Sequence, residues 1–192
     1  EKVLYLRNCH LPYDDKFISK KKFNRDELGL PLEGFVFTCF NKIYKITRKE
    51  FIIWIKLLKS VEGSVLWLIK PNDTAVKNLY SELETYGVDR ERLIFADVMN
   101  IHDHISRHSC ADLFLDTFNF NAASTAQIAL AYGLPIITLL GKSLTARIAG
   151  SILSSCDLNE LITYNTTQYE QLAYELATNK EKFNQIREKI KN

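Results

Sequence analysis

The sequence has little methionine, little glycine and no long apolar run. Its 192 residues hold one methionine and seven glycines, and no set of these glycines forms the G-x-G-x-x-G or G-x-x-x-x-G-K-[ST] pattern. Those patterns bind dinucleotides and nucleoside triphosphates, and the G-x-S-x-G and H-E-x-x-H patterns of serine hydrolases and zinc proteases are missing too. No apolar stretch reaches the roughly 18 residues that a bilayer span requires, so no membrane span is expected.

Charge of one sign is also scarce, because the formal net charge is only +2. The densest basic run, SKKKFNR at 19–25, is short, so we interpret it as a solvated linker and expect no nucleic-acid partner. The cysteines are scattered without a C-x-x-C pair, which is typical of small buried side chains in a reducing compartment. They are Cys9, Cys39, Cys110 and Cys156, of which three lie in apolar surroundings. We therefore expect a cytoplasmic protein without a disulfide frame or a zinc site.

What the sequence does contain, from residue 35 onward, is an alternation of short apolar runs and helix-length segments. Nearly continuous apolar runs predict strands that are buried on both faces. They lie at 35–40, 65–69, 92–96, 111–117 and 134–140, with a sixth, edge strand at 160–165. This pattern predicts an α/β fold, a Rossmann-like parallel sheet of about six strands with helices on both faces.

Helix-length segments follow the predicted strands. Thr47 and Glu50 predict a capping box at the start of the first helix, which carries an apolar stripe of Phe51, Trp54, Ile55, Leu58 and Val61. Further helices are predicted near 74–86, 103–109, 124–132, 143–155, 167–178 and 180–191.

The length of the chain suits one compact domain. Residues 1–30 fit the strand–helix alternation less well and are predicted to be a connecting arm, which leaves 31–192 as the domain itself. The chain begins at Glu1 and its only methionine is Met99, so we expect it to be part of a longer protein.

Ligands of open parallel sheets bind outside the carboxyl ends of the strands. The informative loops are therefore 41–45, 97–104 and 118–125. In the third loop, small Ala122 and Ala123 let backbone approach an anion. Ser124 and Thr125 stand at a helix start, where free N–H groups and hydroxyls can bind a phosphate, and the alternative is that one of them only caps the helix.

The first two loops supply cations and imidazoles. Lys45 follows a buried strand and can reach a phosphate as a point charge, with an ordinary surface lysine as the alternative. His104, Arg107 and His108 share one face of a short helix, since they are three and four residues apart. Two histidines without a further ligand nearby do not predict a metal site.

The acidic residues of the fourth strand give no motif, because Asp112 and Asp116 are separated by apolar residues and do not form the D-x-D pattern of a metal–nucleotide site. What remains is a diphosphate site made of a lysine, a helix start and a polar helix. Such a site suits a nucleotide-sugar donor, because fixed donors and cations can stabilise the charge of a departing UDP without a metal or another cofactor.

Six collinear blocks of the sequence resemble a known family. In chain order they read EGFVFTCFNKIYKI, GSVLWLI, RLIFA, ADLFLDT, GLPIITLLGKSLTARIAGSIL and ELIT. Together they resemble the carboxyl-terminal, donor-binding lobe of the O-linked N-acetylglucosamine transferase family, particularly its bacterial members fused to tetratricopeptide repeats. The resemblance implies one lobe of a GT-B glycosyltransferase that is inverting and metal-independent, with a UDP-sugar donor and a protein acceptor.

The resemblance also implies roles for single residues. In the block FNKIYKI, the resemblance implies that Asn41 and Lys42 bind substrate and that Lys45 contacts the diphosphate and serves catalysis. The position of Met99 holds uracil through its backbone, and those of His104 and Arg107 line the nucleotide. The small polar helix start of the family corresponds to Ala123, Ser124 and Thr125. The catalytic base and the acceptor groove belong to the amino-terminal lobe, so the isolated lobe is expected to be inactive.

Several positions depart from the family pattern. Ala123 replaces a histidine, Ile128 an acidic residue that holds the ribose, Ile101 a polar residue near uracil, and Lys42 a neutral amide. A ribose without its carboxylate partner loses about 1.5 to 3 kcal/mol. Two alternatives therefore stay open: a degenerate donor lobe that serves as a binding or scaffolding module, and a transferase with another donor or acceptor, such as an N-glycosyltransferase.

Overall fold

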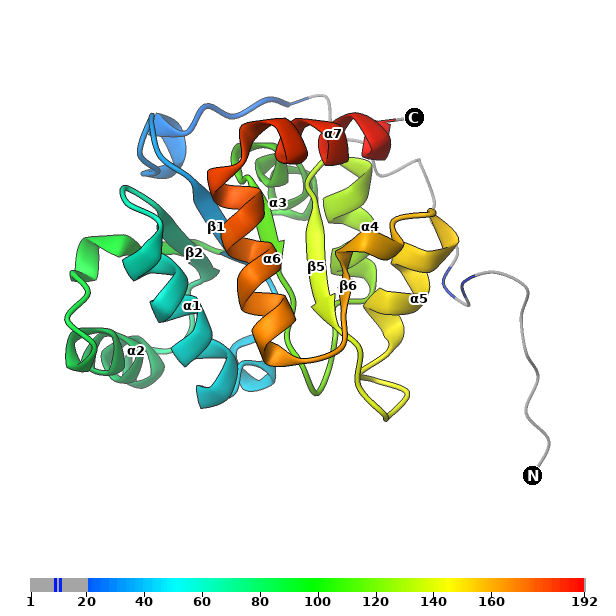
Figure 1. Ribbon diagram of the computed structural model, residues 1–192. Coiled ribbons are helices and arrows are strands. Elements are labelled where there is room, and N and C mark those ends of the chain that lie inside the picture. The colour runs from blue at the N-terminus through cyan, green and yellow to red at the C-terminus, as the bar shows by residue number, and fades with distance from the viewer. Residues whose placement is uncertain (1–8, 10, 12–20, 192) are drawn as a thin grey trace.

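The fold is a six-stranded parallel sheet between helices (Figure 1). The computed structural model describes residues 9, 11 and 21–191. The strands are β1 (Val36–Cys39), β2 (Val65–Ile69), β3 (Leu93–Ala96), β4 (Leu113–Leu115), β5 (Ile136–Leu139) and β6 (Ile162–Thr163). Their order is β3-β2-β1-β4-β5-β6, with every neighbouring pair parallel. This confirms the predicted fold class and all six strands, although the strands are shorter than the apolar runs.

The helices cover both faces of the sheet. They are α1 (Arg48–Ser60), α2 (Asp73–Thr85), α3 (Ile101–Ser106), α4 (Ser124–Ala131), α5 (Ile148–Ser155), α6 (Thr166–Thr178) and α7 (Lys180–Lys191). In Figure 1, α1 and α6 lie in front of the strands and α4 lies behind them. The short α3 continues as a 3-10 turn (Arg107–Cys110), and α5 begins five residues later than predicted.

The core forms where the predicted apolar stripe of α1 meets the sheet and α6. All five stripe residues are buried, and the indole Nε1 of Trp54 donates to the Tyr169 hydroxyl across 3.4 Å. The predicted capping box is wrong in detail. The Thr47 hydroxyl donates to the Glu50 carboxylate instead of accepting from a helix amide, because Glu50 is fully buried and also accepts from the Phe118 N–H at 2.9 Å.

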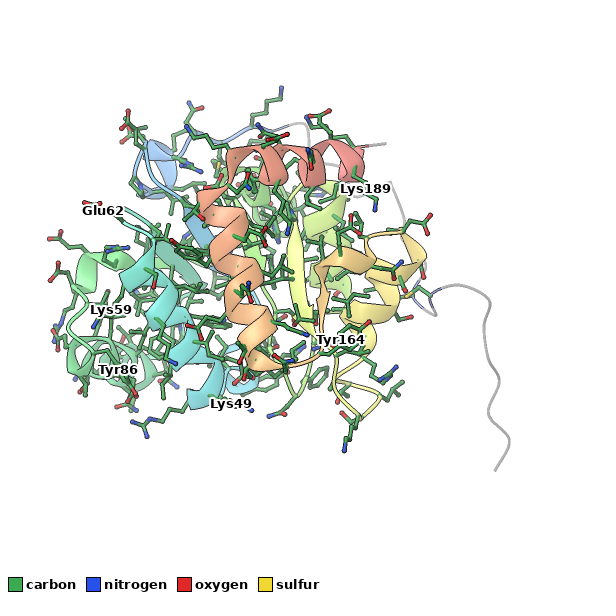
Figure 2. All side chains as sticks on the ribbon, viewed as in Figure 1. Lys49, Lys59, Glu62, Tyr86, Tyr164 and Lys189 are labelled. Carbon is green, nitrogen blue, oxygen red and sulfur yellow. The ribbon has the colours of Figure 1, made fainter. Side chains whose placement is uncertain are left out.

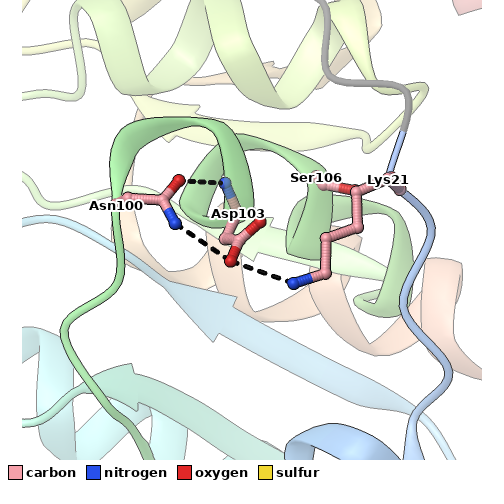
Figure 3. Close-up of polar contacts among 4 residues, drawn as sticks. All are labelled: Lys21, Asn100, Asp103 and Ser106. Atoms are coloured by element: carbon pink, nitrogen blue, oxygen red, sulfur yellow. Dashed lines mark hydrogen bonds and ion pairs between the residues drawn. The ribbon is translucent and has the colours of Figure 1, made fainter.

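The described part of the predicted arm packs against the domain. The Lys21 ammonium lies 3.0 Å from the Asp103 carboxylate, which also accepts from the Asn100 side chain (Figure 3). Arg25 reaches Asp112 at 2.6 Å, at the entry to β4. The rest of the arm lies outside the described residues.

Two observations bear on the expectations from composition. Cys39 and Cys110 are buried and Cys9 is half-buried, but Cys156 is exposed, because it ends α5 at the surface. Within residues 9, 11 and 21–191, every helix is too short or too polar to cross a membrane.

Candidate functional site

The site lies where the chain order of the sheet reverses. From β1 the chain turns through α1 to β2, whereas from β4 it turns through α4 to β5 on the other side. Since β1 and β4 are neighbours, their exit loops diverge and leave a crevice at the carboxyl edge, the usual position of ligands in such sheets. The arrow of β5 points toward this edge, at the lower side of Figure 1.

Lys45 spans this crevice. It closes a 3-10 turn (Ile43–Lys45) after β1, and its Nζ donates to the carbonyl oxygen of Asn121, 3.2 Å away, in the loop after β4. The same Nζ lies 3.8 Å from the ring centre of Phe120. Burial lowers the pKa of Lys45 below its ordinary value, and the carboxylate of Asp116 opposes that shift. The predicted diphosphate cation is therefore held at the switch point by the β4 exit loop.

A buried carboxylate that the sequence motifs did not indicate fixes this loop. Asp116 is 0% exposed and accepts four hydrogen bonds, from the Asn41 amide (3.1 Å), the Thr117 N–H (2.9 Å), the Ala122 N–H (2.7 Å) and the Thr138 hydroxyl (2.7 Å). Burial raises the pKa of Asp116 to about 7, while these donors favour the ionised form and oppose the shift. Asn41, predicted to bind substrate, is buried, and its side-chain amide joins the end of β1 to the β4 exit through Asp116 and Thr117.

The start of α4 offers backbone donors three residues after Asn121, whose carbonyl accepts from Lys45. Ala123 is the N-cap residue and no side chain caps the helix, so neither Ser124 nor Thr125 has the capping role considered as the alternative. Ser124 is exposed and Thr125 half-buried. Uncapped first-turn N–H groups and the helix dipole favour an anion at this point.

A second cluster lies at the exit of β3. The Arg107 guanidinium donates to the Asp97 carbonyl at 2.7 Å and to Nδ1 of His104 at 2.6 Å, and it stacks 4.9 Å from the ring centre of Phe40. Phe40 follows β1 directly, so it connects this cluster to the crevice. Arg107 is only 1% exposed, and burial lowers its pKa to about 10.

The hydrogen bonds assign the histidine tautomers. Nδ1 of His108 lies 2.9 Å from the His104 carbonyl and 3.1 Å from the Ile105 carbonyl, so it carries the proton. Nδ1 of His104 accepts from Arg107, so its proton is on Nε2. Burial and the charge of Arg107 lower the pKa of His104 to about 4, and burial lowers that of His108 to about 3. Both rings are neutral at physiological pH.

We expect NMR titration of the imidazole resonances to give midpoints near pH 4 for His104 and near pH 3 for His108. An ordinary histidine titrates near about 6.5. Because the folded-state values are lower, the stability that the neutral rings contribute is present above about pH 6.5 and lost as the pH falls toward 4 and 3.

Arg107→Met is the control for that titration. Removing the neighbouring cation will move the His104 midpoint upward only in part, because burial is the larger cause of its low pKa. A midpoint near 6.5 in the parent chain would contradict the buried cluster.

The structure brings the predicted site residues into two groups. Lys45 and the α4 start at Ala123, Ser124 and Thr125 meet through the β4 exit loop, while His104 and Arg107 form the second group. Three predicted residues remain. Asn41 is buried against Asp116, Lys42 is exposed in the same loop as Lys45, and Met99 is half-buried in the loop before α3.

His108 is not available on the polar face predicted for α3. It is 0% exposed, and its Nε2 has no hydrogen-bond partner within the described residues. No group of three histidine, cysteine, aspartate or glutamate side chains in that same part of the chain is placed to hold a metal ion.

Known proteins share the sequence pattern and the fold of this chain. The chain is 31% identical over its whole length to the SEC protein of Arabidopsis thaliana, covering 20% of it. It is 30% identical over 87% of its length to the UDP-N-acetylglucosamine–peptide N-acetylglucosaminyltransferase of Caenorhabditis elegans, covering 14% of that protein. An O-GlcNAc transferase mutant of Thermobaculum terrenum matches with a TM-score of 0.81 and 26% identity, over 94% of this chain and 34% of that one.

These similarities confirm the family resemblance seen in the six sequence blocks. The chain spans only 14 to 20% of the two curated relatives named above. The model of glycosyl transferase family 41 matches residues 18–192, and this chain therefore belongs to that family.

Proposed function

We propose that this chain is the UDP-sugar-binding lobe of an inverting, metal-independent glycosyltransferase that transfers a sugar to protein hydroxyls. The observation that carries the proposal is the position of Lys45, whose ammonium group is held at the β1–β4 switch point by the Asn121 carbonyl, 3.2 Å away. A fixed cation beside an uncapped helix start is suited to a diphosphate.

The two residue groups divide the donor between them. Lys45 and the backbone of Ser124 and Thr125 would bind the diphosphate and stabilise the negative charge that grows on UDP as the sugar leaves. His104, which is neutral, and Arg107 would lie along the nucleoside, with the backbone near Met99 toward the base. The groups that bind and deprotonate the acceptor would come from the amino-terminal lobe, and tetratricopeptide repeats of a cytoplasmic parent protein would select acceptors.

A specific observation favours the second candidate, a degenerate lobe that binds or scaffolds without catalysis. The Lys45 ammonium group lies 3.8 Å from the centre of the Phe120 ring, and Ala123 and Ile128, at and after the start of α4, stand where the family pattern has a histidine and an acidic residue. A transferase with another donor would explain the same two positions, and a thermal-shift screen of UDP-sugars distinguishes it by the donor that raises the melting temperature most.

The double variant Ala123→His, Ile128→Asp tests these candidates by calorimetric titration with UDP. If the lobe is a working donor site, the unchanged chain will already bind UDP. The double variant will then bind UDP about tenfold tighter, a gain of about 1.4 kcal/mol in binding free energy, because the new carboxylate accepts from the ribose hydroxyls. Ala131→His, at the exposed far end of α4, is the matched control and will leave the affinity unchanged. Binding by the double variant alone would favour the degenerate lobe.

A further inference from the structure

A second cavity opens at the same edge of the sheet. It has a volume of about 570 Å³ and lies where the exit loops of β4, β5 and β6 meet the starts of α1 and α6. Its size is that of a small-molecule pocket. Figure 2 shows two residues of its lining, Lys49 on α1 and Tyr164 after β6, at the lower edge of the molecule. Lys45 and Phe120, which define the donor crevice, are not part of its lining.

The charges of this cavity are unbalanced. Lys49 and Lys142 are both exposed lining residues, and within the described part of the chain neither ammonium group has a hydrogen-bond or ion-pair partner. The carboxylate of the lining, Glu50, is 0% exposed and already accepts from the Phe118 N–H and the Thr47 hydroxyl. Two cations therefore face a pocket whose acid is already satisfied.

Backbone donors add to those two cations. Because the Thr47 hydroxyl is turned to Glu50, no side chain caps the first turn of the 13-residue helix α1. The N–H groups of that turn and the positive end of the helix dipole favour negative charge at the cavity.

The cavity wall is also connected to Lys45. The Thr145 hydroxyl donates to the Asn119 carbonyl at 3.0 Å, and the Asn121 N–H donates to the Thr145 carbonyl at 2.9 Å. Asn121 is the residue whose carbonyl holds Lys45. A ligand between the β4 and β5 exit loops would thus contact the segment that positions the proposed donor cation.

We propose that this cavity binds a phosphate-bearing ligand at a site separate from the donor crevice. Several anionic oxygens on one group can accept from lysines and helix amides at once, and the remaining volume holds the body of the ligand. The phosphoryl group belongs either to a small phosphorylated metabolite or to a phosphorylated side chain of the acceptor polypeptide.

The test is an amide NMR titration of the chain with inorganic pyrophosphate, and in a second arm with a phosphoserine peptide. We expect shifts at Thr47, Lys49 and Glu50, and at 141–143 and 164–166, all of which line the cavity. Tighter binding of pyrophosphate identifies a metabolite as the source of the phosphoryl group, and tighter binding of the peptide identifies the acceptor. The proposal is overturned if neither probe shifts these amides even at concentrations that saturate weak anion binding to the exposed lysines of the surface.

Matched variants separate this site from the donor site. At the amides that line the cavity, Lys49→Gln with Lys142→Gln will weaken the pyrophosphate affinity by tenfold or more, about 1.4 kcal/mol. The control pair Lys77→Gln with Lys180→Gln, exposed lysines elsewhere, and the variant Lys45→Met will leave the affinity reported by these same amides within about twofold, although Lys45→Met weakens pyrophosphate binding in the donor crevice. Equal losses in the control pair would show non-specific attraction and overturn the site, whereas loss in Lys45→Met alone would place pyrophosphate in the donor crevice. Failure of UDP to bind would leave these outcomes unaffected.

Discussion

Replacing Lys45 by methionine will weaken UDP binding by tenfold or more, about 1.4 kcal/mol or greater. Methionine keeps most of the length of the side chain but loses the ammonium group that donates to the Asn121 carbonyl at the switch point. Charge-assisted contacts to phosphate are the strongest polar contacts available to this crevice. Calorimetric titration of both chains with UDP measures the difference.

Lys42→Met is the control for that comparison. Lys42 is exposed in the same loop, and its loss removes the same formal charge without touching the β4 exit loop. We expect its effect to stay within about threefold, the scale of a screened surface charge. Equal losses in the two variants would show that net charge, and not the position of Lys45, drives binding.

The second large effect is on stability. Asp116→Ala will lower the free energy of unfolding by about 3 kcal/mol or more, because it leaves several buried donors without an acceptor. Those donors are the Asn41 amide, the N–H groups of Thr117 and Ala122, and the Thr138 hydroxyl. Urea denaturation followed by circular dichroism measures the loss.

Asp89→Ala supplies the matched control, because Asp89 is exposed and its side chain caps no helix. A surface change of this kind stays within about 0.5 kcal/mol. If Asp116→Ala were equally mild, the buried network would not be what holds the β4 exit loop. If Asp116→Ala does not fold at all, its loss of unfolding free energy is larger than expected but has the expected sign.

Asp116 also makes stability depend on pH, and NMR titration of its side-chain carboxyl resonance measures the pKa responsible. Burial raises its pKa to about 7, above the unfolded value of 3.8. The stabilisation from binding its proton is therefore fully present below about pH 4 and lost as the pH rises through 7. This direction is opposite to that of the two histidines.

The strands and the helix stripe could be predicted because their signals are local. A run such as VLWLI at 65–69 is apolar on both faces, and only a strand covered by helices on each side buries it all. The strand order needed a further constraint, since nothing within β1 or β4 states that they are neighbours. The position of Lys45 at the site was predicted from two sources: the family resemblance, and the rule that ligands bind outside the carboxyl ends of parallel strands.

The polar interior of the site could not be predicted because its partners are far apart in the sequence. Asp116 meets Asn41 and Thr138 only when β1, β4 and β5 lie side by side in the sheet. In the sequence, Asp116 simply follows an apolar run and belongs to no motif. The capping box at Thr47 failed for the same reason: a long-range contact, the Phe118 N–H, engages Glu50 and draws the hydroxyl toward the carboxylate.

One measurement tests the donor site most directly: amide NMR of the chain titrated with UDP. The account predicts saturable shifts at 41–45 and 118–125, the exit loops of β1 and β4, together with the segment from Asp97 to Arg107 after β3. Shifts that avoid Lys45 and the start of α4, or no shift at all when UDP saturates a related transferase of this family, would contradict it.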